Sequence, residues 1–577
     1  MISVERSFFD RFPRLAEGRA RSFSQPVVQL LRKIAGEERI NRTLTQFQAL
    51  SGFDFIERVL DEFQVSYRVA NTDRDNIPAE GRLVVVANHP LGAFDALALL
   101  HLIGTVRRDV RILANDLLAQ LKPLSGLLLP VPIFGGNGVS VGRLRCAYRA
   151  LASEQVLIMF PAGEVSRFGP QGVRDGPWSS GFARLAWHAD APLLPVHIAA
   201  YNSPAFYSLS LLAKPLSSLL LAREMFGAMR MKIGINVGET VSAGELARVP
   251  PECAAQAMRR HVYQLARRRP TVFATSRAIA HPESPLAIRE ALKRAQVLGQ
   301  TRDGKRILLF DAQPDCPLLR EIGRLRELSF RRVGEGTGTR RDLDRFDAHY
   351  RHLLLWDADA LAIVGAYRLG EAGSILDTHG HAGLYSSTLF DYASAPTEFL
   401  RAGVELGRSF VQPAFWGSRS LDYLWQGIGA YLRCRSDLRY LFGPVSLSAA
   451  LPAQAREWIV HYHRHYFGGS SGVQARNPFE ISQVVAARAS SAWQGCDCTA
   501  GAALLKLRLA ELDCSLPVLY RQYVDLCEPE GVKFLAFGSD PAFGNCVDGL
   551  IRLDLTKLKP GKRARYLSPD SAGVAVD

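Results

Sequence analysis

The chain has 577 residues, too many for one hydrophobic core, so we expect at least two domains. An apolar content of 47 % excludes a disordered or fibrous chain. The formal net charge of +14 fits an acidic protein or an anionic membrane surface, and without a recognisable nucleic-acid motif we expect no nucleic acid partner. The nine Cys are scattered, which predicts neither a disulfide framework nor a metal site.

Three apolar segments bear on membrane contact. The chain shows no signal-peptide core and no apolar run of about 18 residues, so we expect no spanning helix. Residues 7–42 mix Phe with many Arg, and residues 205–226 are apolar but broken by Lys and Pro, as in helices that lie on a membrane surface. Residues 116–134 suit a core element or a tunnel for an apolar chain instead.

The first informative element is a predicted strand over residues 83–87. It ends in Asn88-His89-Pro90, and a turn with Gly leads to Asp95 and an apolar helical segment. Catalytic groups in α/β folds commonly follow strand ends. A neutral imidazole can take a proton from a hydroxyl nucleophile while a carboxylate holds the ring in one tautomer, so this spacing favours acyl transfer with His89 and Asp95 as catalytic residues.

Two further predicted strands complete the pattern. Residues 155–160 run into Pro161-Ala162-Gly163-Glu164 and on to Arg167, and residues 191–200 read APLLPVHIAA. The three blocks in this order resemble the lysophosphatidate/glycerolipid acyltransferase superfamily over the first half of the chain. The resemblance implies that His89 and Asp95 are catalytic and that the residues around them bind substrate, namely Asn88, Pro161, Gly163, Glu164 and Arg167.

The chain departs from that family in two ways that concern phosphate recognition. Five residues separate His89 from Asp95 where the family has four, and Glu164 follows the Gly of its block instead of preceding it. Residues 130–137 occupy the place of the family's Arg-bearing block but contain no Arg. These departures argue against phosphate recognition and so against a glycerophosphate acceptor. Arg167 either substitutes in part or is a solvated loop charge.

The first domain is expected to end after a helix over residues 254–269. A stretch rich in Pro, Ser and His follows, which places the linker near residues 270–285 and predicts domains of residues 1–275 and 276–577. Residues 285–300 show helical spacing, and residues 304–313 resemble a strand. The strand-end blocks do not recur, so the second domain has a different fold.

The second domain carries an ordered series of charged motifs. A helical pattern with Arg326 and Phe330 precedes the Gly-rich turn that contains Glu335, and Asp344 and Asp347 follow. A strand over residues 361–370 contains Arg368, residues 399–411 place Glu405 near Arg408, and residues 421–432 form an amphipathic helix. This order resembles the acyl-homoserine-lactone synthases, which have a GNAT-type fold. Over the whole second half the motifs resemble the ornithine N-acyltransferases, which implies an α/β GNAT-like domain.

N-acylation of ornithine explains why these residue types occur together. Carboxylates can hold the δ-ammonium while an Arg binds the α-carboxylate, which leaves the α-amine free to attack a thioester. The candidates for the first role are Asp344, Asp347 and Glu405, and those for the second are Arg326, Arg368 and Arg408. Glu335 and Glu405 are candidate bases. We expect about half of these residues to form structural ion pairs.

Together the halves resemble the bifunctional ornithine lipid synthases, with two α/β domains in one chain. The resemblance implies that the C-terminal domain makes lyso-ornithine lipid and the N-terminal domain acylates its 3-hydroxyl. We expect no cofactor, and the missing pyrophosphate-binding motif favours an acyl carrier protein as donor, which a basic chain attracts. The expected location is the cytoplasmic face of the inner membrane. Alternatives are a lysine or glutamine head group, one inactive domain, or a lysophospholipid acyltransferase with a hemolysin-like, non-catalytic second half.

Overall fold

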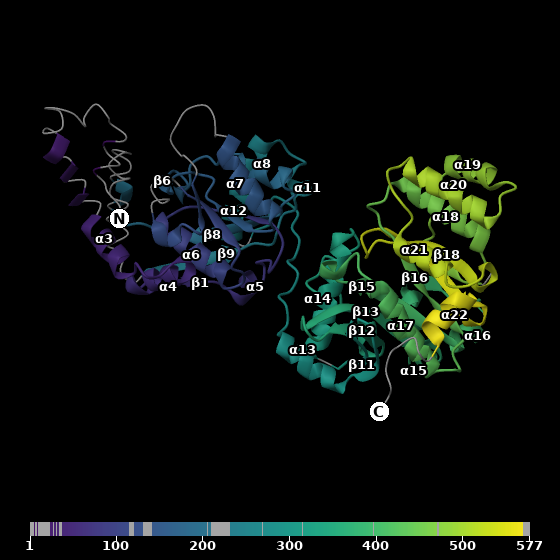
Figure 1. The fold of residues 1–577 in the computed structure, drawn as a ribbon. Coiled ribbons are helices and arrows are strands. Elements are labelled where there is room, and N and C mark those ends of the chain that lie inside the picture. Colours follow the sequence, from purple (N-terminus) through teal and green to yellow (C-terminus); the bar gives the residue numbers. More distant parts are fainter. Residues whose placement is uncertain are drawn as a thin grey trace. The chain divides into compact units, whose positions relative to one another are not determined.

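The computed structural model describes residues 37–114, 121–130, 141–204, 206–208, 231–267, 269–313, 315–395, 397–469 and 472–568, with scattered positions before residue 37. Most of residues 7–42, 130–137 and 205–226 therefore lies outside the described residues, including the expected membrane segments. Of residues 116–134 the structure describes 121–130, where Leu124, Leu127 and Leu128 are buried in an apolar core cluster. The chain divides into two compact units, Met1–His281 and Pro282–Asp577 (Figure 1).

The N-terminal unit is built on a seven-stranded sheet in the order β1-β9-β8-β2-β5-β3-β4. Its strands are β1 (Ser66–Arg68), β2 (Leu83–Ala87), β3 (Val110–Ala114), β4 (Leu128–Pro130), β5 (Val156–Met159), β8 (Leu193–Ala199) and β9 (Lys232–Val237). All neighbours pair in parallel except β8 and β9. A short hairpin, β6 (Arg167–Gly169) and β7 (Gly172–Arg174), stands outside the sheet.

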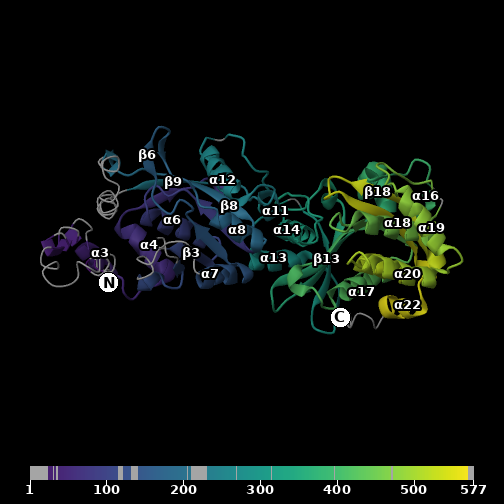
Figure 2. The same cartoon turned by 90° about the horizontal axis from the view of Figure 1, so that it is seen from above.

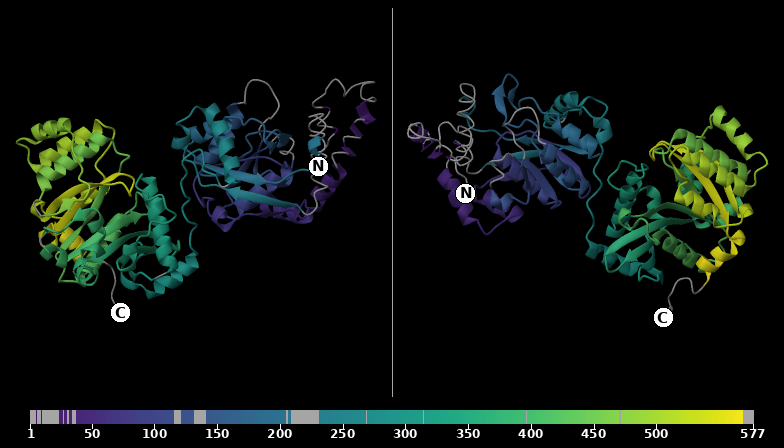
Figure 3. Two further views of the ribbon diagram at one scale, coloured as in Figure 1. Left: turned by 180° about the vertical axis from the view of Figure 1, so that it is seen from behind. Right: turned by 45° about the horizontal axis from the view of Figure 1, so that its top comes forward.

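Helices cover both faces of this sheet (Figure 3). They are α3 (Glu37–Gln46), α4 (Gly52–Glu62), α5 (Asn71–Arg74), α6 (Ala93–Gly104), α7 (Val141–Ala152), α8 (Gly181–His188), α11 (Ala243–Leu246) and α12 (Pro251–Leu265), with the 3₁₀ turn η3 (Lys122–Leu124). One apolar cluster joins α4 and α6 to the sheet, and a second joins α7, α8 and α12 to the opposite face. Buried on both faces, β2 and β5 are continuous apolar runs, which is why the sequence shows no alternation there.

The C-terminal unit is built on an eight-stranded sheet in the order β10-β11-β12-β13-β15-β16-β19-β18. Its strands are β10 (Gln296–Gln300), β11 (Arg306–Asp311), β12 (Arg351–Asp357), β13 (Ala362–Glu371), β15 (Gly403–Val411), β16 (Tyr440–Leu447), β18 (Val532–Asp540) and β19 (Cys546–Asp554), and β14 (Phe390–Asp391) pairs with β17 (Gln474–Ala475). Only β15 and β16 are parallel, and they pair over Gly403–Glu405 alone. The unit is mixed α/β, as expected.

The helices of this unit pack on two sides of the sheet (Figure 2). They are α13 (Pro285–Ala291), α14 (Pro317–Arg332), α15 (Ala372–His379), α16 (Thr397–Arg401), α17 (Ser420–Arg433), α18 (Ala453–Phe467), α19 (Gln483–Trp493), α20 (Cys498–Ala510), α21 (Val518–Val524) and α22 (Pro560–Leu567). Short 3₁₀ turns are η4 (Leu292–Arg294), η5 (Arg345–Ala348), η6 (His381–Gly383), η7 (Tyr385–Thr388), η8 (Pro413–Phe415), η9 (Pro529–Gly531) and η10 (Leu555–Lys557). The largest core cluster packs helices α17, α18, α19, α20, α21 and α22 against one face of the sheet, and two smaller clusters lie on the other face.

One predicted element was wrong. Residues 285–300 were expected to be helical, but α13 ends at Ala291 and residues 296–300 form strand β10. The turn at residues 301–305, closed by hydrogen bonds between Thr301 and Lys305, folds β10 back on β11 as a hairpin. Pairing along the sheet edge therefore overrides a short helical pattern.

Among the described residues, no helix is both long and apolar enough to cross a bilayer.

Candidate active sites

The first candidate site forms where parallel strands β2, β5 and β8 end at one edge of the N-terminal sheet. His89 follows β2, Asp95 lies in the first turn of α6, and the block from Phe160 follows β5. His89 Nδ1 lies 3.2 Å from Asp95 Oδ2. The chain order that the sequence predicted thus brings these two residues together at the carboxyl ends of the strands.

A tight turn fixes the position of Asp95. Gly92 has a φ of +87°, which favours glycine, and the backbone N–H groups of Leu91 and Gly92 donate to Asp95 Oδ2 at 2.7 and 3.1 Å. Asp95 is fully buried, and its Oδ1 has no hydrogen-bond partner among the described residues. A carboxylate held by two backbone amides remains a good acceptor for the imidazole proton.

His89 is fixed from three sides. Its ring stacks on Phe160 with the centroids 4.0 Å apart, its backbone N–H donates to Asp175 Oδ1 at 3.1 Å, and its carbonyl accepts from the Ser166 N–H at 2.8 Å. Although Nδ1 lies close to Asp95, it makes no well-aligned hydrogen bond. Such contacts often tighten only when substrate binds. With 18 % of the side chain exposed, Nε2 is the ring nitrogen open to an acceptor hydroxyl.

Asp175, which the sequence analysis missed, supports this site from the β7 side. Its carboxylate accepts hydrogen bonds from Ser166 Oγ, from Trp178 Nε1 at 2.9 Å and from the His89 backbone. Burial raises the pKa of this carboxyl, and its hydrogen bonds oppose that shift. Asp175 lies in a loop without periodic pattern, so no sequence signal pointed to it.

The predicted substrate-binding residues around His89 differ in accessibility. Both polar atoms of Asn88 are used, donating to the Ile198 carbonyl at 2.8 Å and accepting from its N–H at 2.7 Å, so Asn88 joins β2 to β8. Pro161 is buried, and its carbonyl accepts from the Ser179 N–H. Gly163 turns the chain with a φ of +67°. Glu164 and Arg167 lie at the surface as an ion pair with 3.2 Å between Nε and Oε2.

The second candidate site lies on the face of the C-terminal sheet opposite the largest core cluster. Buried ion pairs hold its base together: Arg326 pairs with Asp347 at 2.8 Å, and Arg368 pairs with Asp344 at 2.6 Å and with Asp347 at 3.2 Å. The side chains of Arg326, Asp347 and Arg368 are at most 3 % exposed. Burial opposes ionisation of Asp347, but the two arginines outweigh it and lower the pKa of its carboxyl. These three residues therefore fasten α14 and η5 to β13.

Arg408 and Asp344 lie at the open edge of this network. Arg408 Nε is 3.3 Å from Asp342 Oδ2, and its Nη2 is 3.6 Å from Asp344 Oδ2. Arg408 lies in a bulge of β15 and has a φ of +50°. Two residues of β15, Arg408 and Ser409, stand there opposite the single residue Tyr367 of β13. A bulge re-aims a side chain, and strained backbone of this kind clusters at functional sites.

Glu405, a candidate base, is used internally. It is 1 % exposed, and its carboxylate accepts from the Tyr350 hydroxyl, from the Ser386 N–H at 2.6 Å and from the Tyr385 N–H at 3.2 Å. Burial raises the pKa of Glu405. This geometry makes Glu405 a positioning residue for η7, whose Tyr385 ring lies 4.7 Å below the Arg408 guanidinium.

Glu335, the other candidate base, is half-buried and available. The loop that carries Glu335 packs closely against Gly544. A side chain at position 544 would clash, because its Cβ would lie 2.8 Å from the Gly334 carbonyl oxygen, and Gly544 also has a φ of +66°. Burial, with the Asp548 carboxylate nearby, raises the pKa of Glu335 to about 7. A carboxyl that titrates near neutral pH is suited to general base catalysis.

Asp548, on β19, is a second carboxylate beside Glu335 that the sequence analysis missed. It is 3 % exposed, it accepts from Ser446 Oγ at 2.6 Å, and burial raises its pKa to about 6. Neither carboxylate has an ion pair among the described residues. Every second residue of β19, namely Cys546, Asp548 and Leu550, faces the same side of the sheet. This alternation is the sequence pattern that could have placed Asp548 on the side of the candidate site.

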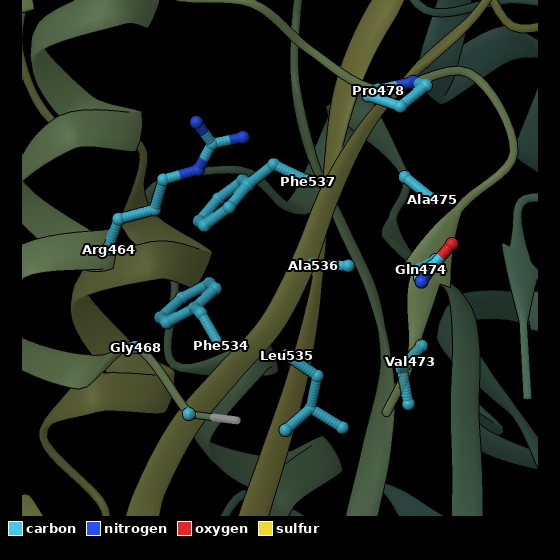
Figure 4. Close-up of a pocket in the computed structure, with 11 residues that line it drawn as sticks. Arg464, Gly468, Val473, Gln474, Ala475, Pro478, Phe534, Leu535, Ala536 and Phe537 are labelled. Atoms are coloured by element: carbon cyan, nitrogen blue, oxygen red, sulfur yellow. The ribbon is translucent and has the colours of Figure 1, made fainter. Parts of the chain in front are cut away.

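A separate groove of about 410 Å³ lies at the edge strand β18 (Figure 4). Phe534 and Phe537 of β18 lie on the side of Arg464, whose guanidinium is 5.5 Å from the centre of the Phe537 ring. Leu535 and Ala536 lie on the other side of the strand, toward Val473, Gln474, Ala475 and Pro478. The groove is mostly apolar and contains no carboxylate, so it is distinct from the charged site. Within the described part of the chain, no group of His, Cys, Asp and Glu is arranged to hold a metal ion.

Comparisons with known proteins agree with the two-domain division. Residues 12–275 match the model of the Acyltransferase family, and residues 325–426 match that of the Acetyltransferase (GNAT) domain. A lyso-glycine lipid O-acyltransferase of Bacteroides thetaiotaomicron is 32 % identical over 222 residues, which cover 37 % of this chain and 80 % of that protein. The expected pairing of a lipid acyltransferase domain with a GNAT-like domain is thereby confirmed.

Two N-acyltransferases are also similar. A glycine N(alpha)-acyltransferase of Phocaeicola vulgatus is 31 % identical over 203 residues, covering 33 % of this chain and 61 % of that protein. An L-ornithine N(alpha)-acyltransferase of Brucella abortus is 34 % identical over 180 residues, covering 25 % of this chain and 60 % of that protein. The chain thus spans about three fifths of the length of each of these relatives.

Proposed function

This chain belongs to the acyltransferase family, and we propose that it makes a diacylated amino-acid lipid in two steps. The C-terminal unit transfers a 3-hydroxyacyl chain from a carrier thioester to the α-amine of ornithine, which gives lyso-ornithine lipid. The N-terminal unit then esterifies the 3-hydroxyl of that lipid. The relatives named as aminolipid N- and O-acyltransferases support both reaction types.

In the O-acylation step, His89 acts as general base. Nε2 takes the proton of the acceptor hydroxyl while its oxygen attacks the thioester carbonyl, so an ester C–O bond forms and the C–S bond breaks. The proton then passes from His89 to the leaving thiolate. Asp95, held by two backbone amides, keeps the Nδ1 proton of His89 in place and stabilises the charged ring.

In the N-acylation step, Arg408 binds the α-carboxylate of the amino acid and Glu335 accepts a proton from the α-amine. An amide C–N bond forms, the C–S bond breaks, and the proton lost by the amine neutralises the leaving thiolate by way of Glu335. The positive φ of Arg408 and the raised pKa of Glu335 are the features expected of residues held for catalysis.

The observation that supports a diamino acid is the pair of unneutralised carboxyls, Glu335 and Asp548. One base is sufficient for the α-amine, so the second carboxylate is free to bind another ammonium group, such as the δ-ammonium of ornithine. Glycine has no such group and would leave Asp548 without an ammonium partner. The second candidate head group is nonetheless glycine, because two relatives at 31 and 32 % identity are named for it.

An acyl carrier protein is the proposed donor, and the cytoplasmic membrane surface is the proposed location. Carrier proteins of this kind are acidic, and a chain with a net charge of +14 attracts both them and anionic lipid. A single chain with both activities also keeps the amphiphilic intermediate at a high effective concentration near the second site.

The test is lipid mass spectrometry of bacteria that lack aminolipids and express the full chain. Wild type should yield diacylated ornithine lipid, His89→Ala should accumulate the lyso form, and Glu335→Gln should yield neither lipid. Arg184→Gln, an exposed position on α8, serves as the control and should match wild type. Detection of lipids with a glycine head group would assign glycine as the substrate and leave the proposed mechanism unchanged. The absence of any aminolipid from well-expressed wild type would refute the proposal.

A further inference from the structure

A cationic cluster surrounds the ring of Tyr263 in the N-terminal unit, and the mechanism above does not use it. The Arg174 guanidinium lies 4.9 Å from the ring centre and the Arg259 guanidinium lies 5.6 Å from it. The imidazole of His197 meets the same ring edge-on at 5.5 Å. Strand β7, helix α12 and strand β8 thus each contribute one nitrogen-bearing side chain to one place.

No carboxylate neutralises this cluster among the described residues. Neither Arg174 nor Arg259 forms an ion pair there, and Arg259 meets Asp175 through that residue's backbone carbonyl. Arg167 stands directly opposite Arg174 in the hairpin, which places like charges face to face. Arg167 is balanced by Glu164, whereas the one side-chain acceptor of Arg174 in the described part of the chain is the neutral Gln171. The charge of Arg174 and Arg259 therefore remains available to an anion.

Two buried polar atoms of the cluster also lack hydrogen-bond partners among the described residues. Arg259 Nε and His197 Nδ1 are buried and form no hydrogen bond with the described residues. His197 is only 9 % exposed. Buried polar atoms are normally satisfied, so these two atoms, beside two guanidinium groups without an ion pair among the described residues, are consistent with a site for an anion.

The cluster is connected to the catalytic histidine through one residue. Arg174 is followed by Asp175, whose carboxylate accepts the His89 backbone N–H at 3.1 Å and whose own N–H donates to the Tyr263 hydroxyl at 2.8 Å. The cationic group and the catalytic base are thus held by the same short segment. Because Arg174 directly precedes Asp175, an acceptor bound at His89 would lie beside the segment that carries Arg174.

We infer that Arg174 and Arg259, with Tyr263 between them, form a subsite for the free carboxylate of the amino-acid lipid acceptor. The inference rests on the proposed function, since an N-acylated amino acid keeps its α-carboxylate a few bonds from the 3-hydroxyl that is esterified. A guanidinium group binds a carboxylate through paired N–H donors. The subsite would let the enzyme select an amino-acid lipid through its carboxylate.

The test compares two acceptors with the purified full-length protein and one acyl thioester donor. The acceptors are N-(3-hydroxyacyl)ornithine and the same molecule with its carboxylate converted to a carboxamide. For wild type, the carboxamide should raise KM by roughly tenfold to a hundredfold, which corresponds to loss of a charged hydrogen bond. Arg174→Gln should raise KM for the carboxylate acceptor by a similar factor, leave its kcat nearly unchanged and have little effect on the carboxamide.

Two variants control for folding and for charge. Arg174→Lys keeps the cation and should recover part of the lost affinity, and Arg184→Gln, which removes an exposed cation from the same unit, should behave as wild type. If Arg174→Gln raises KM equally for both acceptors, or raises KM for the donor instead, the subsite does not bind the acceptor carboxylate. If wild type acylates neither acceptor, the proposed function itself fails, which is a separate result.

Discussion

Asp175 Oδ1 accepts a hydrogen bond from the backbone N–H of His89 at 3.1 Å, so a carboxylate fixes the main chain of His89 while Asp95 approaches its ring. The same Asp175 carboxylate accepts from Trp178 Nε1 and Ser166 Oγ. The loop after β5, the hairpin β6–β7 and the strand end of β2 are therefore tied together at one buried group. The orientation of His89 depends on residues far apart in the chain.

Asp175→Ala should lower O-acylation strongly and leave N-acylation unchanged. Three donors would lose their acceptor, and each buried donor left unpaired costs about 1–3 kcal/mol. A shift of the His89 backbone should cost on the order of a hundredfold in rate. The measurement is turnover of supplied lyso-lipid, with formation of lyso-lipid from ornithine as the internal control. Equal loss of both activities would indicate general unfolding instead.

Asp95→Asn should separate the structural role of Asp95 from the catalytic role proposed for it. The amide oxygen can still accept the N–H groups of Leu91 and Gly92, so α6 should keep its N-terminal turn and the melting temperature should change little. Asparagine cannot stabilise a charged imidazole as a carboxylate does. We expect kcat for O-acylation to fall on the order of a hundredfold or more.

The contrasting variant is Asp95→Ala, which loses both functions and should also lower the melting temperature. If Asp95→Asn retains wild-type turnover, Asp95 is a helix-capping residue only and has no part in the proton transfer.

Arg368→Met should destabilise the C-terminal unit. Arg368 is 1 % exposed and pairs with Asp344 and Asp347, and removal of one partner from a buried ion pair typically costs about 3–5 kcal/mol. The measurement is urea unfolding followed by circular dichroism. Arg401→Ala is the matched control, because Arg401 and its partner Asp377 are both about 60 % exposed and such pairs contribute about 1 kcal/mol or less. Equal effects of the two substitutions would contradict the structural role of Arg368.

Local motifs in the sequence predicted much of the N-terminal site, because its residues come from the ends of neighbouring parallel strands. His89 with Asp95 and the block at Pro161 could be found as strand-end signals. Asp175 could not, since it reaches the site by way of a hairpin that sheet topology does not determine. The strand β10 was mistaken for helix for a related reason: its conformation comes from pairing with β11.

The charged motifs of the C-terminal unit could be predicted as a group but not by role. Sequence offers Arg326, Arg368 and Arg408 alike as candidates to bind the α-carboxylate. The first two are 1 % exposed and form close ion pairs, whereas Arg408 is 10 % exposed and forms longer ones. Burial depends on tertiary packing, which spacing does not report. The same holds for Glu405 and Glu335, of which only Glu335 lacks hydrogen-bonding partners that occupy its carboxylate.

The pH dependence of N-acylation should reveal whether Glu335 is the base. Burial and the neighbouring Asp548 raise the pKa of Glu335 to about 7, and only the carboxylate form can accept a proton from the amine. The rate should therefore rise with pH through about 7 and level off above it. Glu335→Gln should remove this inflection and lower kcat on the order of a hundredfold or more, as loss of a general base does.

Stability provides an independent readout of the same group. Because its pKa is raised in the folded state, folded protein binds more protons than unfolded protein between the ordinary pKa of glutamate and about 7. The contribution of Glu335 to stability is therefore full at low pH and is lost as pH rises through about 7. Glu335→Gln should flatten the dependence of melting temperature on pH over this range. Glu290→Gln, at an exposed position on α13, should leave both the rate profile and the melting profile unchanged near neutral pH, and an unchanged inflection in Glu335→Gln would assign the base to another residue.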